Sequence, residues 1–314
     1  MKILFLNKLS KDWEVQYNKL KEEFPEVEFT ELTDQNERNN ALGKADAVIA
    51  GRLTAQEIES SSKLKAVIVP FTGLNNFPIE IISRKKIKLY NTHANAPYVA
   101  EHAVALALAL LGKVVPFHSD LKKGIWNRTK EVDDMWMTIR NKKIGILGYG
   151  HIGIYIAKYL RVYDTHIIGF KRNIPVNKDE YADEISNDIS EVLGKSDIIF
   201  NVLPLNPETR GIINAENLAQ MQGKYIISVG RGETIQEEPL YNALKDNILA
   251  GVALDVWYNY PGKKEEPVLP ANFPFWELPN VLLSPHKSSH TTGAVNAMIE
   301  DTCQNIRIFI SSNK

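Results

Sequence analysis

Three side chains that could do chemistry follow apolar segments in the C-terminal half of the chain: Arg231, Asp255 and His286. An arginine offers a planar fork of N–H donors that matches a carboxylate, and a histidine exchanges protons near neutral pH. Carbonyl reduction by a bound hydride donor requires such a cation and such a proton donor. Because an arginine between Gly230 and Gly232 has little packing role, these residues predict an oxidoreductase site.

Three glycines between an apolar run and a helical pattern indicate a bound dinucleotide. Gly148, Gly150 and Gly153 follow residues 144–147 in the spacing G-x-G-x-x-G. In this fingerprint the first glycine permits the turn, the second lets the backbone approach a pyrophosphate, and the third lets the helix pack on the strand. The alternative is a merely structural turn. The expected cofactor contacts are Gly148, Tyr149, Gly150, His151, Ile152 and Gly153.

Two cations follow the next apolar segment, residues 166–170, where an NAD-preferring site usually carries Asp or Glu. Lys171 and Arg172 suit a 2′-phosphate better than a bare ribose, because they can form charge-assisted hydrogen bonds with it. In the alternative, both side chains simply point into solvent. The sequence therefore favours NADP, with NAD as the second choice.

Composition limits the class of protein. The chain has 314 residues, of which 44% are hydrophobic, and a formal net charge of -1. This length suffices for two α/β domains, and the charge gives no support for nucleic-acid or membrane-surface binding. The single cysteine, Cys303, excludes an internal disulfide framework and lies in a helical apolar pattern, which indicates a core residue. We expect a reducing, cytoplasmic location.

The elements that would position the chemical residues alternate between strand and helix. Residues 1 to about 92 predict a parallel sheet covered on both faces, and Thr54 to Glu57 has capping-box form. Strands are expected at Lys2–Leu6, Val27–Leu32, Ala47–Ala50, Lys65–Val69 and Lys88–Asn91. Because this part has no glycine fingerprint, it is predicted to be a separate domain.

A helix from Pro97 to Leu111, with Val104, Leu108 and Leu111 on its apolar face, leads into the second domain. Six parallel strands are expected there, at Ile144–Leu147, His166–Phe170, Asp197–Leu203, Tyr225–Val229, Gly251–Asp255 and Val281–Ser284. Ligands bind beyond the carboxyl ends of such strands, which is where the chemical residues lie. A final helix, Gly293 to Ile310, is expected to pack on the first domain.

With these segments placed, the chain resembles the D-2-hydroxyacid dehydrogenase family, the NAD(P)-dependent group that includes phosphoglycerate, glycerate and formate dehydrogenases. The matching segments are Val99–Ala103, Gly148–Gly153, Pro204–Arg210, Ser228–Gly232, Ala250–Trp257 and Ser284–His286. The first domain matches more loosely. The resemblance implies an α/β protein of two doubly wound parallel-sheet domains. A Rossmann nucleotide domain at 95–288 would be inserted into a flavodoxin-like substrate domain at 1–94 and 289–314.

The resemblance also implies residue roles. Arg231 would bind the substrate carboxylate and polarise the carbonyl, His286 would act as general acid or base, and Asp255 would hold the nicotinamide carboxamide. Backbone N–H groups of the loop Pro70–Leu74 would grip the carboxylate, in a cleft between the domains that closes on substrate. The implied substrate contacts are Phe71, Thr72, Gly73 and Arg231, and the further cofactor contacts are Leu203, Pro204, Thr209, Val229, Gly230, Asp255 and His286.

One position departs from the family pattern. Members usually carry a glutamate just after the Asp-Val-Trp/Phe segment, where this chain has Tyr260. An ionised glutamate would favour the protonated form of the neighbouring histidine, whereas a tyrosine hydroxyl can orient the ring but brings no charge at neutral pH. We therefore place Tyr260 in the catalytic group and expect keto-acid reduction to be favoured toward lower pH.

Four other histidines and four tryptophans are interpreted as structural residues. His93, His102, His118 and His290 are expected to be surface or satisfied core residues, and Trp126, Trp136, Trp257 and Trp276 to be packing residues. Phe71 either shapes a substrate pocket or fills core. No metal site is expected.

The sequence thus predicts an NADP-preferring enzyme that reduces a small 2-keto acid to its D-2-hydroxy acid, with glyoxylate or hydroxypyruvate as plausible substrates by analogy. Its partners would be this small molecule and a second copy of the chain, paired through the nucleotide domain, with no nucleic acid or membrane. The replacement at Tyr260 leaves two rivals open: oxidation of formate or phosphite, and a cofactor sensor with little turnover. Retention of Arg231 and His286 argues against the sensor.

Overall fold

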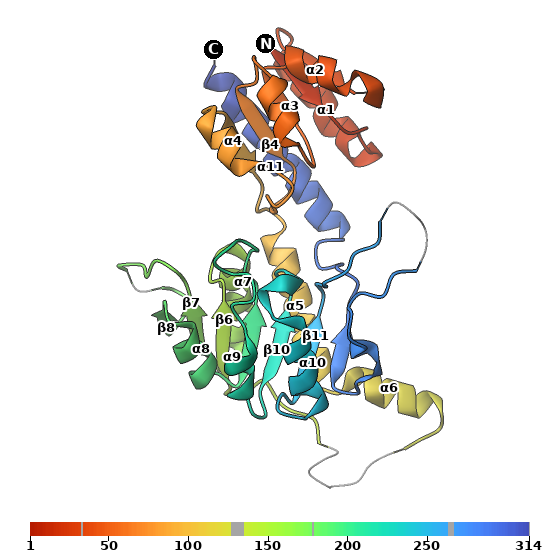
Figure 1. Ribbon diagram of the computed structural model, residues 1–314, viewed down its shortest axis with the longest axis vertical. Helices are drawn as coiled ribbons and strands as arrows, with labels where there is room; N and C mark the ends of the chain where they lie inside the picture. Colours follow the sequence, from red (N-terminus) through yellow and green to blue (C-terminus); the bar gives the residue numbers. More distant parts are fainter. Residues whose placement is uncertain (33, 127–134, 178, 263–266, 314) are drawn as a thin grey trace. The chain divides into compact units, whose positions relative to one another are not determined.

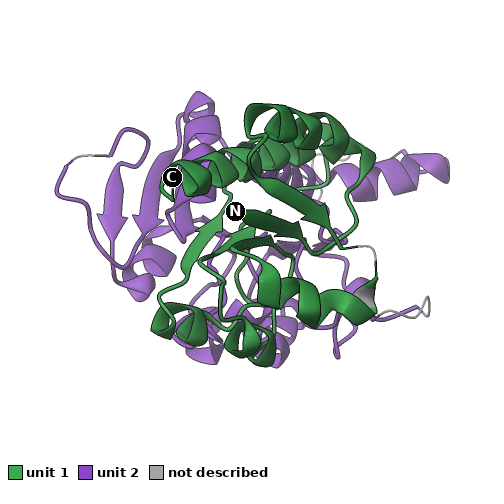
Figure 2. Cartoon of the chain, turned by 90° about the horizontal axis from the view of Figure 1, so that it is seen from above, with its two compact units in different colours: residues 1–95, 289–314 green, residues 96–288 purple. Residues whose placement is uncertain are grey.

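The computed structural model describes residues 1–32, 34–126, 135–177, 179–262 and 267–313. The chain divides into two compact units (Figure 2): unit 1 is Met1–Asn95 with Ser289–Lys314, and unit 2 is Ala96–Ser288. Each unit is a parallel sheet with helices on both faces (Figure 1). The α/β architecture of two doubly wound sheets is therefore confirmed.

Unit 1 has five strands in the order β2-β1-β3-β4-β5. They are β1 (Lys2–Phe5), β2 (Glu28–Glu31), β3 (Ala47–Ile49), β4 (Ala66–Val69) and β5 (Lys88–Asn91), each inside its expected range. The helices are α1 (Lys11–Glu23), α2 (Arg38–Lys44), α3 (Ala55–Ser60), α4 (Ile79–Arg84) and α11 (Thr292–Ser311). Chain order along the sheet reverses between β1 and β3, the kind of position at which open α/β sheets bind ligands.

The two faces of this sheet carry separate cores, because successive strand residues point to opposite sides. Leu4, Val48 and Val67 face α2, α3 and α4, whereas Ile3 and Ile68 face α1 and α11. Helix α11 supplies Ile299, Cys303, Ile306, Phe309 and Ile310 to the second core, which confirms that the final helix packs on the first domain.

Two local expectations in unit 1 are confirmed. Thr54 and Glu57 form a capping box at the start of α3, each side chain accepting the other residue's backbone N–H. Cys303 is fully buried, and burial raises the pKa of its thiol to about 11. A thiol with so little thiolate at neutral pH is a core residue and not a nucleophile.

Unit 2 has seven strands in the order β12-β11-β10-β9-β6-β7-β8. They are β6 (Lys143–Leu147), β7 (His166–Phe170), β8 (Glu184–Ser186), β9 (Ile198–Asn201), β10 (Tyr225–Ser228), β11 (Gly251–Leu254) and β12 (Val281–Leu283). The helices are α5 (Ala96–Leu111), α6 (Val114–Lys122), α7 (His151–Leu160), α8 (Ile189–Lys195), α9 (Ala215–Ala219) and α10 (Glu237–Lys245). One face packs on α5 and α7, and the other on α8, α9 and α10.

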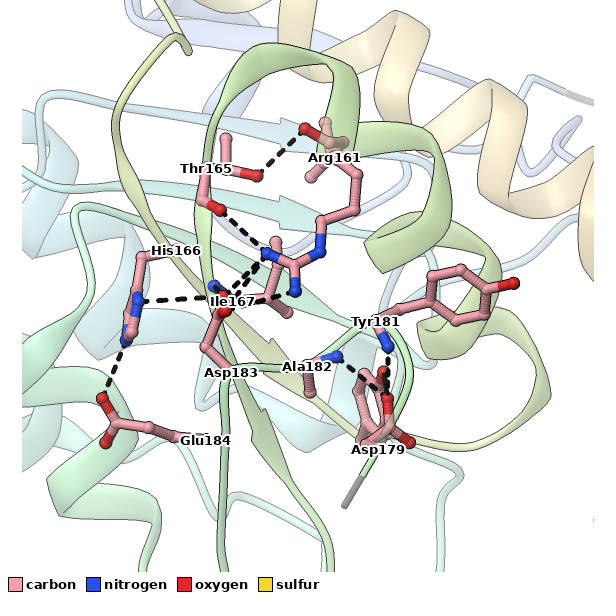
Figure 3. Close-up of polar contacts among 11 residues, drawn as sticks. Arg161, Thr165, His166, Ile167, Asp179, Tyr181, Ala182, Asp183 and Glu184 are labelled. Carbon is pink, nitrogen blue, oxygen red and sulfur yellow. Dashed lines mark hydrogen bonds and ion pairs between the residues drawn. The ribbon is translucent and has the colours of Figure 1, made fainter.

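The expectation of six strands in this domain is wrong, because β8 adds a seventh at the edge beside β7. Ile185 is its one apolar residue, so no apolar run marks it. Polar contacts secure this edge (Figure 3): Asp183 accepts the Ile167 N–H at 2.7 Å and pairs with Arg161 at 3.0 Å. The carboxylate of Asp179 accepts the N–H groups of Tyr181 and Ala182, both at 2.9 Å.

On helix α5, Leu111 is buried and Val104 packs against the core as expected, but Leu108 is not part of the buried face. Leu108 is 36% exposed, whereas small side chains such as Ala100, Ala103 and Ala107 are fully buried where α5 packs on α7. Small residues at a helix contact let the two axes approach. Among the described residues no single helix is long and apolar enough to span a bilayer, although α5 and α6, bent by 57°, together match such a segment in length and composition.

The packing role expected for the four tryptophans holds for Trp257, which is 5% exposed in the core of unit 2. It is wrong for Trp126, Trp136 and Trp276, whose exposed fractions are 74%, 60% and 37%. Trp126 follows α6, a helix with no buried residue. Apolar side chains therefore gather on the surface around α6.

Candidate active site

The glycine loop after β6 has the geometry of a dinucleotide-binding turn. Gly148 has a φ of +93°, and a Cβ there would lie 3.0 Å from the Val202 backbone. A Cβ on Gly153 would lie 3.0 Å from the Gly148 carbonyl oxygen, so both glycines are required by packing. At Gly150 the nearest described atom would be that same oxygen, 4.0 Å away. The space above Gly150 is therefore open, as backbone contact with a pyrophosphate requires.

Tyr149 turns its side chain away from this open space and into the protein. Its ring lies where a Cβ on Gly169 would be only 2.7 Å away, and its hydroxyl donates to Asp179 at 2.6 Å. Burial, and secondarily the Asp179 carboxylate, raise the pKa of Tyr149. The tyrosine thus ties the glycine loop to the segment between β7 and β8. His151 and Ile152, which were also predicted to contact the cofactor, are the first two residues of α7.

The two cations after β7 are exposed, but Arg172 does not simply point into solvent. Its guanidinium pairs with Glu208, in the loop that follows β9. Both side chains of this pair are about 70% exposed (70% and 68%). Such a surface pair contributes about 1 kcal/mol at most, so an incoming phosphate could displace Glu208. The structure therefore leaves Arg172 available to an anion at the carboxyl end of β7.

The loop after β9 is closed by its own side chains. Thr209 is buried, and its hydroxyl donates to the Pro204 carbonyl at 2.6 Å and accepts the Asn206 N–H at 2.9 Å. Leu203 and Val229 are likewise buried, whereas Pro204 is exposed. Of these predicted cofactor contacts, Pro204 is the one with an exposed side chain.

Arg231 is held between two close backbone approaches. A Cβ on Gly230 would lie 2.6 Å from the Leu203 carbonyl oxygen, and a Cβ on Gly232 would lie 2.4 Å from that of Trp257. The Arg231 guanidinium donates to the Gly230 carbonyl at 2.7 Å. The flanking glycines therefore fix the path of the backbone that carries the arginine.

A buried polar network also holds the loop that carries Arg231. The Thr234 hydroxyl donates to the Arg231 carbonyl at 2.7 Å and accepts from the Asn201 amide at 2.8 Å. Asn201 is fully buried and also donates to Ser228 at 3.0 Å. Fully satisfied networks of this kind hold one conformation. Asn201 and Thr234 are supporting residues that the sequence patterns did not reveal.

Asp255 is fully buried after β11, and both of its oxygens accept hydrogen bonds from the segment after β12. One oxygen accepts from the Ser284 hydroxyl and from the Lys287 N–H at 2.9 Å, and the other accepts the Ser288 N–H at 3.0 Å. Burial alone would raise the pKa of Asp255, but these hydrogen bonds hold it below its usual value. The ionised carboxylate therefore clamps the turn from Ser284 to Ser288.

His286 sits within that turn in a strained backbone conformation. Its φ is +55°, in the left-handed region that residues with a Cβ seldom adopt. The clamp from Asp255 and a 2.8 Å hydrogen bond from the Trp257 indole to the Ser284 carbonyl hold the turn on both sides. Such strain persists only where its surroundings over-determine it, and it gathers at functional sites.

His102 is a hydrogen-bonded structural residue, as expected, but the sequence did not show which residues it contacts. On α5, its Nε2 lies 3.2 Å from the Ser284 hydroxyl and 3.9 Å from Asp255. His102 thus belongs to the polar cluster that holds the turn of His286. A separation of 182 residues from Ser284 explains why no local pattern showed this.

Tyr260 contacts His286 through its ring. The two ring centroids are 5.5 Å apart and inclined by 59°, while the Tyr260 hydroxyl accepts the Trp257 N–H at 3.2 Å. Burial raises the pKa of Tyr260, and the nearby Arg231 charge opposes that shift. The phenol therefore remains neutral at neutral pH. Of the predicted catalytic residues of unit 2, Tyr260 and His286 are therefore in contact, and the Arg231 charge is near enough to lower the pKa of Tyr260.

In unit 1, the loop Pro70–Leu74 is anchored by Thr72. The Thr72 hydroxyl lies 2.9 Å from both the Thr92 carbonyl and the Asn95 side-chain oxygen, and the Thr72 carbonyl accepts from Asn91 at 2.9 Å. No described residue accepts a hydrogen bond from the backbone N–H of Phe71, Thr72 or Gly73. These donors are therefore available to an anion. The Phe71 ring packs against the core on the α2–α4 side of the sheet.

A group of three His, Cys, Asp or Glu side chains able to hold a metal ion does not occur among the described residues. The chemistry available therefore consists of Arg231, His286 and Tyr260 in unit 2, with an open glycine turn on the same sheet. This combination can bind a carboxylate and transfer a proton next to a dinucleotide site.

The chain is similar to known proteins in sequence and in fold. The family model for the NAD-binding domain of D-isomer specific 2-hydroxyacid dehydrogenases matches residues 104–288. The glyoxylate reductase of Pyrococcus furiosus is 31% identical over 306 residues, which cover 93% of this chain and 88% of that protein. The D-3-phosphoglycerate dehydrogenase of Methanocaldococcus jannaschii is 31% identical over 285 residues, 89% of this chain but 52% of the relative, so this chain spans about half of that protein's length.

Among solved structures, an acyclic imino acid reductase in complex with NADPH and D-Arg has a TM-score of 0.82 to this chain. It is 25% identical and matches 99% of this chain and 98% of its own. The sequence motifs, the two sheets and these similarities agree. The chain belongs to the D-2-hydroxyacid dehydrogenase family, whose members are NAD(P)-dependent oxidoreductases.

Proposed function

We propose that the protein reduces a small 2-keto acid to its D-2-hydroxy acid and prefers NADP(H) to NAD(H). The observation that carries this proposal is the ring contact of Tyr260 with His286, with the Arg231 charge near enough to lower the pKa of Tyr260. Arg231 would bind the substrate carboxylate and polarise the adjacent carbonyl. His286 would give a proton to the carbonyl oxygen as it becomes a hydroxyl, and would take that proton back in oxidation.

For the cofactor, the open space at Gly150 supports a pyrophosphate beside the glycine turn. When bound, the nicotinamide supplies the hydride. We further propose that the backbone N–H groups of Phe71, Thr72 and Gly73 bind the substrate carboxylate. The expected contact of Asp255 with the nicotinamide carboxamide stays a prediction, and the hydrogen bonds to Lys287 and Ser288 give Asp255 a second role, in holding His286.

The direct test follows nicotinamide absorbance with glyoxylate and hydroxypyruvate, using NADPH and NADH in parallel. We expect faster oxidation of NADPH, because Lys171 and Arg172 offer charge to a 2′-phosphate.

Arg172→Ala should raise KM for NADPH about tenfold, because one charge-assisted hydrogen bond is lost. The same change should leave KM for NADH nearly unaltered.

The control for that test is Glu208→Gln, which frees Arg172 from its partner. It should lower KM for NADPH. KM for NADH should stay unchanged, because NADH has no 2′-phosphate for Arg172 to bind. A wild-type preference for NADH would contradict the role of the two cations without contradicting keto-acid reduction. Tight cofactor binding with no turnover would instead favour the sensor.

Tyr260→Glu should restore the acidic partner that most family members have. A carboxylate next to His286 stabilises the imidazolium. Because reduction uses the protonated histidine, the fall of the reduction rate with rising pH should move to higher pH. The profile of kcat/KM against pH measures this, with Tyr260→Phe as the control that removes only the hydroxyl. An unchanged profile in Tyr260→Glu would show that residue 260 does not govern the proton of His286.

Tyr260 also favours a second candidate, a reaction that needs no proton donor. Hydride removal from formate leaves no hydroxyl proton to manage. Oxidation of phosphite also needs no proton donor, but a water molecule must form the new P–O bond and give its proton to a base. Reduction of an imino acid is another, because a protonated imine accepts hydride and becomes a neutral amine. The structural similarity to an imino acid reductase supports this last form. Turnover of pyruvate with methylamine that exceeds turnover of pyruvate alone would favour it.

For the assembly, we propose a homodimer through unit 2. Exposed apolar side chains on α6 support it, with exposed fractions of 55% for Val114, 47% for Val115 and 51% for Leu121. A patch of this kind on a surface helix is a common subunit contact. The cytoplasmic location stays a prediction.

A further inference from the structure

Unit 1 contains a cavity of about 180 Å³ at the carboxyl ends of β1, β3 and β4. Its lining includes Phe5, Asn7, Lys8, Trp13, Ile49 and Pro70. It lies where chain order reverses between β1 and β3, the position at which ligands bind in sheets of this order. An apolar cavity of roughly 150 Å³ accepts a benzene molecule, so this one has room for a short side chain.

The lining combines an apolar wall with one cation. Phe5 and Trp13 meet edge to face, with ring centroids 5.7 Å apart. Lys8 is the one charged residue of the lining, and it has no ion-pair partner among the described residues. In the same unit Lys2 and Lys65 do pair with carboxylates. The free ammonium group of Lys8 is therefore available to an anion.

The segment that carries Lys8 is anchored. The Leu9 N–H donates to the Glu31 carboxylate at 3.0 Å, and Ser10 is the N-cap residue of α1. Glu31 itself is not part of the lining. The position of Lys8 at the end of β1 is thus set by the backbone on its C-terminal side.

The cavity is continuous with the loop proposed to bind the substrate carboxylate. Pro70 lines the cavity and also opens that loop. A Cβ on Gly51 would lie 3.4 Å from the Asn7 amide nitrogen and 3.6 Å from the Phe71 ring, so Asn7 and Phe71 flank Gly51. A molecule whose carboxylate meets the N–H groups of residues 71–73 can therefore extend past Phe71 toward Asn7 and Lys8.

We propose that this cavity holds the substrate side chain and that Lys8 selects 2-keto acids with a second carboxylate. The inference rests on the proposed function, since it names the substrate class of the same reaction. Glyoxylate has no side chain to fill the cavity. A chain of two methylenes and a carboxylate would place its apolar part against Trp13 and its charge at Lys8, with Asn7 as a further donor.

The test compares three 2-keto acids as substrates. 2-Ketoglutarate has the second carboxylate, 2-oxopentanoate has the same chain length without it, and glyoxylate has no side chain. We expect KM for 2-ketoglutarate to be about tenfold lower than for 2-oxopentanoate, which is the effect of one charge-assisted hydrogen bond. Lys8→Ala should abolish that difference and leave KM for glyoxylate unchanged. Lys11→Ala, an exposed lysine outside the cavity, is the matched control.

Each outcome decides the matter. A preference for 2-ketoglutarate that survives Lys8→Ala overturns the proposal, and so does an equal rise of KM for glyoxylate. If no 2-keto acid is turned over with either cofactor, the proposed function fails, and the cavity is tested by binding. Thermal stabilisation by 2-ketoglutarate that is lost in Lys8→Ala would still support the cavity, whereas no stabilisation of the wild type would overturn it.

Discussion

Asp255→Asn should lower the free energy of unfolding by about 3 kcal/mol and kcat by about 100-fold. The carboxylate accepts the N–H groups of Lys287 and Ser288 and the hydroxyl of Ser284. An asparagine must turn an NH₂ group toward one of these donors, which leaves buried donors facing each other. The turn would shift, and His286 would move with it. Urea unfolding and steady-state kinetics measure the two effects.

The loss of stability should depend on pH. The folded-state pKa of Asp255 lies below its usual value, because the hydrogen bonds outweigh burial. The carboxylate therefore stabilises the fold above about pH 4, and this contribution disappears as pH falls through the lower folded-state pKa. The stability curves of wild type and variant should approach each other in acid.

The control is Asp164→Asn, which alters an exposed carboxylate paired with Arg140. Such a surface pair contributes little, so this variant should stay within about 1 kcal/mol of wild type. If Asp255 served only as a cofactor contact, Asp255→Asn would raise cofactor Kd and leave stability unchanged. That result would contradict the clamp on the turn.

Gly150→Ala should weaken cofactor binding about 10- to 100-fold and barely alter stability. Gly150 has a negative φ of -114°, and its added methyl group would meet no described atom closer than 4.0 Å. The methyl group would instead occupy the space required by the pyrophosphate and break a charge-assisted hydrogen bond to the backbone. Fluorescence titration with NADPH measures Kd directly.

Gly153→Ala is the matched change three residues later. Its methyl group would lie 3.0 Å from both the Gly148 carbonyl oxygen and the Ile146 side chain. We expect a loss of about 1–3 kcal/mol in stability, because α7 must move away from β6.

Equal cofactor affinity in wild type and Gly150→Ala would show that the open space at Gly150 is not the phosphate site.

The parts of the site that sequence predicted correctly are those whose cause is local. Gly148 has the positive φ that its turn requires, and the close approach of Gly153 is to Gly148 and Ile146, a few positions away. Strands β1, β3 and β4 of unit 1 were predicted for the same reason, because each is a short apolar run.

The parts that sequence missed depend on distant partners or on weak local signals. β8 has the single apolar residue Ile185 and is fixed by Asp183, which bonds to Ile167 and Arg161. His102 gains its position from Ser284 across 182 residues. Leu108 on α5 was wrongly expected to be buried, because the closest contacts of this helix are made by alanines.

The passage of the chain out of unit 1 and back has a consequence for biosynthesis. One core of unit 1 needs α11, which supplies residues such as Ile306 and Phe309, yet unit 2 is translated before α11. At about 5–20 residues per second, the ribosome spends roughly 10–40 s on unit 2. During that time Ile3 and Ile68 have no α11 to cover them. The nascent protein therefore presents an apolar surface for chaperones to shield until the last helix emerges.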